Sequence, residues 1–122
     1  MNIKEIINKK YEELNSEEFD YYQENFEDIF IGKIDNKISF SEEEIEDIVW
    51  GSPEEIIVDT EKSEDLDRWS RGVNTFLKIH NRFFRISWEE GLTEYQENYY
   101  PYQPIEVKKH EKQITIIEWE EI

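Results

Sequence analysis

Carboxylates are the reactive side chains that this chain holds in greatest number, and they are crowded into one half of it. Residues 1–67 contain 22 of the 31 Asp and Glu residues but only 6 of the 14 Lys and Arg residues, a local net charge of −16. Residues 68–122 contain 9 acidic and 8 basic residues. Crowding raises the mutual repulsion of like charges, and solubility does not require it. The asymmetry therefore predicts a surface that meets a positively charged partner.

The acidic residues recur in short runs, and their expected spacing is similar to that of phosphates. Residues four apart on a helix are separated by about 6 Å along its axis, and residues two apart on a strand by about 6.7 Å. Both separations are of the order found between neighbouring phosphates of a nucleic acid. The ordinary alternative is a solvated surface. The predicted acidic contact residues are Glu17, Glu18, Asp20, Glu24, Glu27, Asp28, Glu42, Glu43, Glu46 and Asp47.

A second candidate contact surface is the group of tyrosines between residues 95 and 102. Tyr is frequent in binding surfaces because it offers a large area and a hydroxyl group at low entropic cost. The same side chains are equally suited to cover the core from a long loop. Both interpretations stay open at this stage, and the residues included in the predicted contact surface are Tyr99, Tyr100 and Tyr102.

Metal binding is not predicted, although one segment has the length of a calcium-binding loop. Residues 35–46 span twelve positions with Asp first and Glu last. The third position is Lys37, where an oxygen ligand is needed, and the sixth is Phe40, where the sharp turn needs Gly. The sequence thus predicts neither a structural metal nor any other cofactor.

Catalysis is not predicted either. Residues 106–108 have the Glu-x-Lys form of metal-dependent nucleases, but so short a pattern is common by chance and an acidic surface would repel a nucleic-acid substrate. His80 and His110 lie beside predicted turns without a nearby nucleophile, and the chain has no Cys and no Gly-rich phosphate-binding loop. We therefore expect a protein without enzymatic activity.

Aromatic residues supply the material for a core in this polar chain. Hydrophobic and charged residues each make up 37% of the sequence, a balance that alone would raise the question of disorder. Phe, Tyr and Trp make up 15%, and each buries a large area. The length of 122 residues suits one domain, residues 1–122, with an acidic, helix-rich half over 1–67 and a charge-balanced, β-rich half over 68–122.

Periodicity predicts an α+β fold with two or three short helices in the first half and a mainly antiparallel sheet of hairpins. Helices are expected over residues 3–14 and 16–24, and a third follows the capping box of Ser41 and Glu44 and ends near Gly51. Hairpin turns are expected at Asp35–Asn36 and Asn81–Arg82. The predicted strands are residues 29–34, 37–40, 54–60, 73–80, 83–88, 105–109 and 113–119.

The N-terminus lacks the basic and apolar regions of a secretory signal, and no stretch approaches the ~18 apolar residues of a membrane span. With the absence of Cys, this predicts a cytoplasmic protein.

The segments RFFRISWEEGLTEYQEN at residues 82–98, QPIEV at 103–107 and EW at 118–119 resemble the C-terminal region of small uncharacterised proteins of bacteriophages and prophages. The resemblance covers roughly residues 68–120 and brings no catalytic residues with it. It implies a context: small, acidic, non-enzymatic phage proteins are often inhibitors of host defence nucleases, and several resemble DNA in charge.

Together these observations predict a phage-type inhibitor that occupies the basic nucleic-acid-binding groove of a host defence nuclease, such as a CRISPR effector or a restriction enzyme, in the host cytoplasm. The predicted partner is a basic nucleic-acid-binding protein rather than a nucleic acid or a membrane. Two alternatives remain: an immunity protein that neutralises a basic nuclease toxin, and a structural or adaptor protein of a phage particle.

Overall fold

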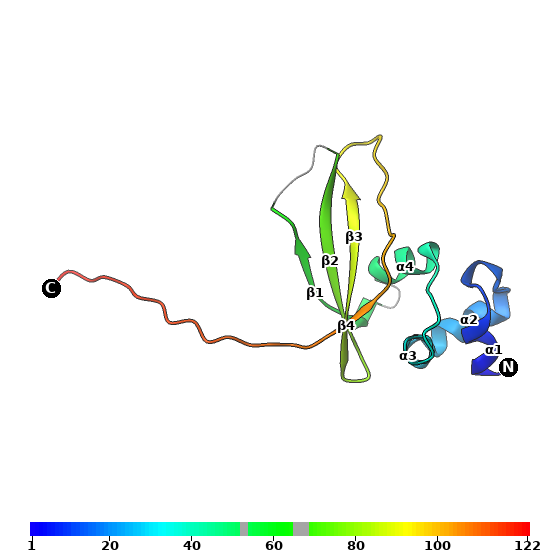
Figure 1. Cartoon of the computed structure of the whole chain (residues 1–122). Coiled ribbons are helices and arrows are strands. Elements are labelled where there is room, and N and C mark those ends of the chain that lie inside the picture. Colours follow the sequence, from blue (N-terminus) through cyan, green and yellow to red (C-terminus); the bar gives the residue numbers. More distant parts are fainter. Residues whose placement is uncertain (52–53, 65–68) are drawn as a thin grey trace.

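The chain folds into a group of short helices followed by one antiparallel sheet (Figure 1). The computed structural model describes residues 1–51, 54–64 and 69–122. The helical elements are α1 (Ile3–Asn8), the 3-10 helix η1 (Tyr11–Glu13), α2 (Ser16–Glu24), α3 (Phe26–Asp35), α4 (Glu42–Val49) and the 3-10 helix η2 (Glu54–Ile56). The strands are β1 (Ile57–Lys62), β2 (Ser70–Ile79), β3 (Arg82–Gly91) and β4 (Ile105–Val107). This arrangement confirms the predicted α+β class.

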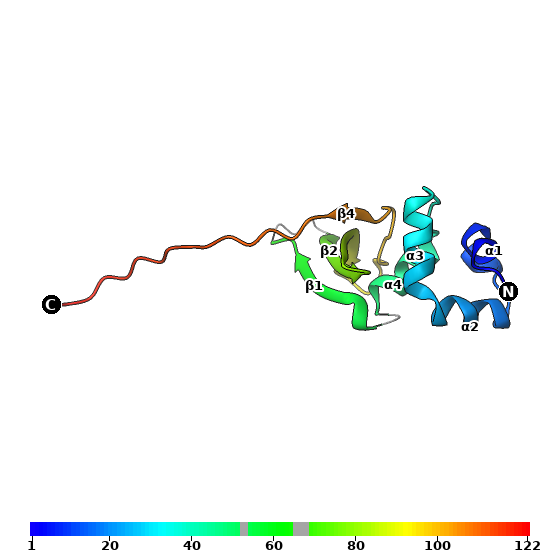
Figure 2. The ribbon, with the colours of Figure 1, turned by 90° about the horizontal axis from the view of Figure 1, so that it is seen from below.

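The four strands pair in chain order, β1-β2-β3-β4, and all three pairings are antiparallel. The helices lie on one side of the sheet, and the chain beyond β4 leaves on the other side (Figure 2). From Val73 to Ile79 of β2 and from Phe84 to Trp88 of β3, every second residue is buried, as expected for a sheet with one face against a core.

Aromatic rings connect the helices to the sheet, as the composition predicted. Tyr11, Tyr22, Phe26 and Phe30 form a continuous chain of ring contacts with centroid separations of 5.3, 5.8 and 5.9 Å. Phe30 then meets Phe84 of β3 in an edge-on contact at 5.0 Å. A few large side chains therefore bury enough area to hold two different layers together.

The predicted hairpin of residues 29–34 and 37–40 is wrong, because residues 26–35 form the helix α3. Four positions of α3 are buried: Phe26, Ile29, Phe30 and Lys33. Their spacing of three, four and seven residues marks one face of a helix. A charged residue at the last of these positions hid that periodicity in the sequence.

The hairpin turn predicted at Asp35–Asn36 is wrong, because Asp35 is the last residue of α3 and the turn at Asn36 and Lys37 ends this helix. Lys37 has a φ of 55°, its N–H donates to the carbonyl of Ile34, and the N–H of Ile38 donates to the carbonyl of Lys33. These two bonds are those of a Schellman motif, which satisfies the last carbonyls of a helix. Polar turn residues after an apolar run are compatible with either structure.

The first predicted helix, residues 3–14, is divided into α1 and η1. Lys9 is extended with φ −93° and ψ 142°, and its ammonium group binds Glu18 at 2.7 Å. Gly32 of α3 lets α1 approach closely, since a Cβ at this glycine would lie 2.4 Å from Cδ1 of Ile7. Tertiary contacts thus set the length of α1.

The predicted β2–β3 hairpin is confirmed, with its turn one residue earlier than expected. His80 and Asn81 both have positive φ, at 50° and 62°, and Arg82 already pairs with Ile79. Positive φ at both central residues is typical of the type I′ turn, which matches the twist of the strands. The predicted strand at residues 54–60 is likewise shifted, because Glu54–Ile56 is the 3-10 helix η2 and β1 follows it.

The second predicted hairpin is wrong. Residues 105–107 form β4, which pairs with residues 83–85 of β3. Residues 113–119 are extended and exposed and have no strand partner in the described part of the chain. Among the described helices, none combines the length and the apolarity that crossing a membrane requires.

Candidate functional site: an acidic groove beside helix α4

Helix α4 begins at a fully formed capping box, as predicted. The side chain of Ser41 accepts a hydrogen bond from the N–H of Glu44, and the carboxylate of Glu44 accepts one from the N–H of Ser41. Ile45, Ile48 and Val49 are buried on one side of the helix. The acidic residues on its other side are exposed: Glu42, Glu43, Glu46 and Asp47.

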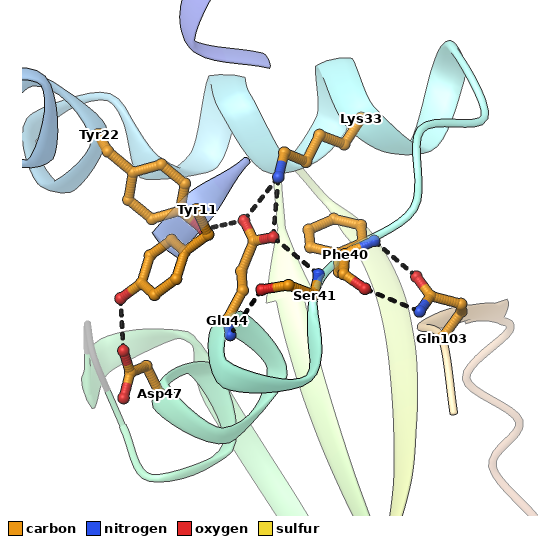
Figure 3. A network of polar contacts seen from close by, with 8 residues as sticks. All are labelled: Tyr11, Tyr22, Lys33, Phe40, Ser41, Glu44, Asp47 and Gln103. Carbon is orange, nitrogen blue, oxygen red and sulfur yellow. Dashed lines mark hydrogen bonds and ion pairs between the residues drawn. The ribbon is translucent and has the colours of Figure 1, made fainter. Parts of the chain in front are cut away.

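Glu44 does more than cap the helix, because it is the centre of a buried polar network (Figure 3). Both of its carboxylate oxygens lie 2.8 Å from Nζ of Lys33, and the side chains are 3% exposed for Lys33 and 0% for Glu44. The hydroxyl of Tyr22 donates a third hydrogen bond, of 2.6 Å, to Oε2 of Glu44. The ring of Phe40 lies 5.1 Å from the ammonium group. The network ties α2, α3 and α4 together.

Burial and the neighbouring charge of Glu44 raise the pKa of Tyr22 well above its usual value, since both disfavour the phenolate. Burial, followed by the hydrogen bond to Asp47, raises the pKa of Tyr11 in the same way. The Tyr11 hydroxyl donates to the Asp47 carboxylate (Figure 3). That bond attaches η1 to α4 and brings Glu12 beside the acidic side of the helix.

The segment after β3 supplies the opposite wall of the site. Its end is held by Gln103, whose side-chain amide exchanges hydrogen bonds of 2.7 and 2.9 Å with the backbone of Phe40 (Figure 3). Tyr100 is buried, stacks on Trp88 with centroids 5.3 Å apart, and accepts a 2.6 Å hydrogen bond from Nε1 of Trp50. These anchors place Glu97 opposite α4.

The result is a hollow of about 880 Å³ with five glutamates around it. We call this hollow the acidic groove, and its acidic residues are Glu12, Glu42, Glu43, Glu46 and Glu97. Gln96, Asn98 and Tyr100 complete the lining. Within residues 1–51, 54–64 and 69–122, none of the five glutamates forms an ion pair. Within these described residues, no cation is therefore in ion-pairing distance of the five carboxylates.

The other predicted acidic contact residues do not join the acidic groove. Glu24, Glu27 and Asp28 line a separate hollow of about 340 Å³ at the start of α3, together with Lys78 and His80. Asp28 lies 2.7 Å from Nε2 of His80, so part of its charge is engaged within the protein.

Glu18 also has a structural role. It accepts a hydrogen bond from the N–H of Asn15, whose side chain in turn caps α2, and it binds Lys9. The Lys9 ammonium is the main cause that lowers the pKa of Glu18. Glu17 and Asp20 are exposed on α2 and line neither hollow. The acidic runs thus lie on more than one part of the surface.

The three predicted tyrosines separate into two groups. Tyr100 is 4% exposed and belongs to the core, so its inclusion in a contact surface is corrected to a role in the wall of the acidic groove. Tyr99 and Tyr102 are about half exposed, at 51% and 54%, and remain candidates for contact. Tyr99 lies next to β3 through a two-way backbone bridge to Glu89.

Sequence reasoning missed two glutamates of the acidic groove and the cation of the buried network. Glu12 and Glu97 come from segments far from α4 in the sequence, and no local pattern connects them. Lys33 had a signal, since it occupies the apolar face of an amphipathic helix, but residues 29–34 were interpreted as a strand.

In the described part of the chain, no group of three or more His, Asp or Glu side chains is arranged to hold a metal ion. No protein family, curated protein or solved structure matches this chain.

Proposed function

We propose that this protein is a non-catalytic inhibitor that binds the basic nucleic-acid-binding surface of a nuclease through its acidic groove. The observation that carries the proposal is the convergence of five glutamates on one hollow, where none of them forms an ion pair with a residue that the structure describes. The nuclease class that fits best is a host defence enzyme, such as a CRISPR effector or a restriction enzyme, met in the host cytoplasm.

The shape and charge of the acidic groove favour a ligand with projecting cations. Field lines from like charges are focused in a concave surface, which raises the local concentration of the opposite charge. Proteins grip phosphates with Lys and Arg side chains, which are long and project from their surface. Such side chains are able to enter the acidic groove and bind its carboxylates in place of phosphates.

The carboxylates on α4 also have a phosphate-like spacing. Glu42 and Glu46 are four residues apart on the helix, a separation of about 6 Å along the axis. The capping box and the buried ion pair of Glu44 fix the helix that carries them. A preorganised ligand loses less conformational entropy on binding than a flexible acidic tail.

Inhibition follows from competition for the same surface. A nuclease whose basic groove is occupied by this protein has no room for its nucleic-acid substrate, and no bond in either protein needs to break. Free nucleic acid is repelled by the same charges that attract the nuclease.

The test begins with capture of binding proteins from a bacterial lysate on the immobilised full-length protein at low and high salt. Each captured nuclease is then purified, and its cleavage of DNA or RNA is measured with increasing amounts of the protein. The key variant is E42Q/E43Q/E46Q. The matched control is E61Q/E64Q/E94Q, which removes three exposed carboxylates outside the acidic groove.

The proposal predicts that the wild type and the control inhibit cleavage, and that the groove variant inhibits about tenfold or more weakly. Surface charge pairs each contribute about 0.2–1 kcal/mol, so three lost together remove about 0.6–3 kcal/mol, a range that includes the 1.4 kcal/mol of a tenfold change. Equal inhibition by both variants would show that only total charge matters. Capture without inhibition would rule out competition with the substrate.

A further inference from the structure

The chain beyond β4 is a long extended segment whose apolar side chains face water. Residues 108–122, which we call the tail, leave the sheet on the side opposite the helices (Figures 1 and 2). The exposed fractions are 81% for Ile114, 77% for Ile116, 75% for Ile117 and 94% for Trp119. Large apolar residues exposed together are a common mark of an interaction site.

The centre of the tail has the composition of a strand. Ile114, Thr115, Ile116 and Ile117 are all β-branched, and Trp119 follows. An extended segment without a partner leaves its backbone N–H and C=O groups free to pair with another strand. The tail is therefore suited to pair with another strand.

The charges of the tail indicate which strand this is, because the positive and negative charges lie at opposite ends of the tail. Three lysines precede the isoleucines, and three glutamates follow or flank Trp119. The lysines are Lys108, Lys109 and Lys112, and the glutamates are Glu118, Glu120 and Glu121. Glu111 lies among the lysines and forms an ion pair of 3.4 Å with Lys109, so three positive charges and one negative charge leave residues 108–112 with a net charge of +2. A segment that is basic at one end and acidic at the other is complementary to itself when two copies run antiparallel.

We propose that the tail is a dimerisation arm, in which residues 109–121 of two copies pair as antiparallel strands about a twofold axis at Thr115. This register places Ile114 opposite Ile116 and Gln113 opposite Ile117. It also places cations opposite anions, since Lys112 faces Glu118 and Lys109 faces Glu121. Each of these pairs occurs twice in the symmetric dimer, since the interface is isologous. Opposite charges across strands stabilise the pairing, and the central isoleucines bury apolar area.

Two other partners within the chain fit less well. A hairpin with residues 105–109 that is closed by a two-residue turn at His110 and Glu111 would set Lys109 opposite Lys112, and like charges directly opposite each other destabilise strand pairing. The free edge of β1 carries Asp59 and Glu61, which would repel the acidic end of the tail. Of these three described partners, a second tail is the one that offers acidic residues to the basic end and basic residues to the acidic end.

The charge distribution of the whole chain agrees with this contact. Two molecules of net charge −17 repel each other at long range. Residues 68–122 have a net charge of only −1, so a contact made through the tails keeps the acidic halves away from the interface. Dimerisation would place two acidic grooves in one particle, and it does not depend on what those grooves bind.

The first test is the mass of the full-length protein, measured by sedimentation across concentrations from about 1 μM to 1 mM. The proposal predicts a mass approaching twice the 15.0 kDa of the chain as concentration rises. K109E/K112E makes the tail predominantly acidic, and E118K/E121K makes it predominantly basic. Each variant alone should lose about tenfold or more in association constant, because it turns attractive cross-strand pairs into repulsive ones.

Two further samples test complementarity directly. An equimolar mixture of K109E/K112E and E118K/E121K should form a heterodimer, and the fourfold variant that combines both sets should regain self-association. A protein that stays monomeric at every concentration, or charge variants that dimerise like the wild type, would overturn the proposal.

The register has its own test, because the chain contains no Cys. Directly opposed residues of antiparallel strands have Cα atoms about 4.5–5.5 Å apart, within the range of a disulfide. Thr115→Cys should therefore cross-link two copies under mild oxidation. Gln113→Cys is the control, since two copies of residue 113 would lie about 13 Å apart. Equal cross-linking of both variants would contradict the register.

Discussion

Both sides of helix α4 carry glutamates, but the buried and the exposed glutamates have different roles. Glu44 is enclosed and binds Lys33, Tyr22 and the cap of its own helix. Glu42 and Glu43, the two residues that precede it in the sequence, are exposed and form no ion pair with any residue that the structure describes. The comparison teaches that a carboxylate run is not one functional unit. One glutamate stabilises the fold, and its neighbours are left free for a partner.

The largest effect on stability is expected from a substitution on the buried side of α4. Glu44→Gln preserves the shape of the side chain but leaves the buried Lys33 ammonium without a counter-charge. Loss of one partner of a buried ion pair costs about 3–5 kcal/mol, a large part of the stability of a small domain. Chemical denaturation at pH 7 measures the free energy of unfolding.

The matched control for that experiment is the double variant K33M/E44Q, which removes both buried charges while the Gln side chain remains able to cap α4. Its free energy of unfolding should lie closer to the wild type than that of E44Q alone. A Glu44→Gln variant as stable as the wild type would mean that the two sides of α4 do not differ as the structure shows.

The tyrosine of the network gives a smaller effect that depends on pH. Tyr22→Phe removes one hydrogen bond from the buried Glu44 carboxylate and should cost about 1–3 kcal/mol at pH 7. Above pH 10 the unfolded phenol ionises, while the raised pKa keeps the folded phenol protonated. Stability of the wild type should therefore fall as the pH rises above 10, and it should fall less steeply in Tyr22→Phe. Denaturation between pH 7 and 11 measures both effects, and an equal slope in the two proteins would contradict the burial of this phenol.

The exposed side of α4 should behave in the opposite way. The variant E42Q/E43Q/E46Q removes crowded like charges, so its free energy of unfolding should equal that of the wild type within about 0.5 kcal/mol or exceed it. Thermal and chemical denaturation at low salt are the appropriate measurements. A loss of stability comparable to that of Glu44→Gln would show that these residues are structural.

The smallest effect is expected at the ion pair of Lys9 and Glu18. Because the pKa of Glu18 is lowered in the folded state, its contribution to stability is present above the usual carboxyl pKa of about 4.3 and is lost as the pH falls through the lowered value. Lys9→Met should reduce stability slightly at pH 7 and leave it unchanged at pH values where Glu18 is protonated. Denaturation at several acidic pH values measures this difference in stability. An effect of Lys9→Met that does not change with pH would contradict the prediction.

The sequence predicted those helices whose characteristic residues lie close together in the chain. The capping box of Ser41 and Glu44, followed by Ile45, Ile48 and Val49, contains all the information needed to place α4. The helix α3 was not predicted, because the burial of Lys33 is explained only by Glu44, a residue of another element.

The glutamates of the acidic groove could likewise be predicted only where they lie close together in the sequence. Glu42, Glu43 and Glu46 could be predicted because they adjoin each other on one helix. Glu97 could not, because its position opposite α4 depends on the anchoring of its loop by Tyr100 and Gln103.

The most direct test of the proposed division between the two sides of α4 is the association rate with a captured nuclease, measured by stopped flow at increasing ionic strength. Exposed charges more than about 8 Å apart are screened at physiological salt, so steering by the acidic groove should slow as salt is added. We predict a steep salt dependence for the wild type and for E61Q/E64Q/E94Q, and a slower rate with a shallower dependence for E42Q/E43Q/E46Q. An association rate that does not change with salt, or that changes equally in all three proteins, would contradict the account.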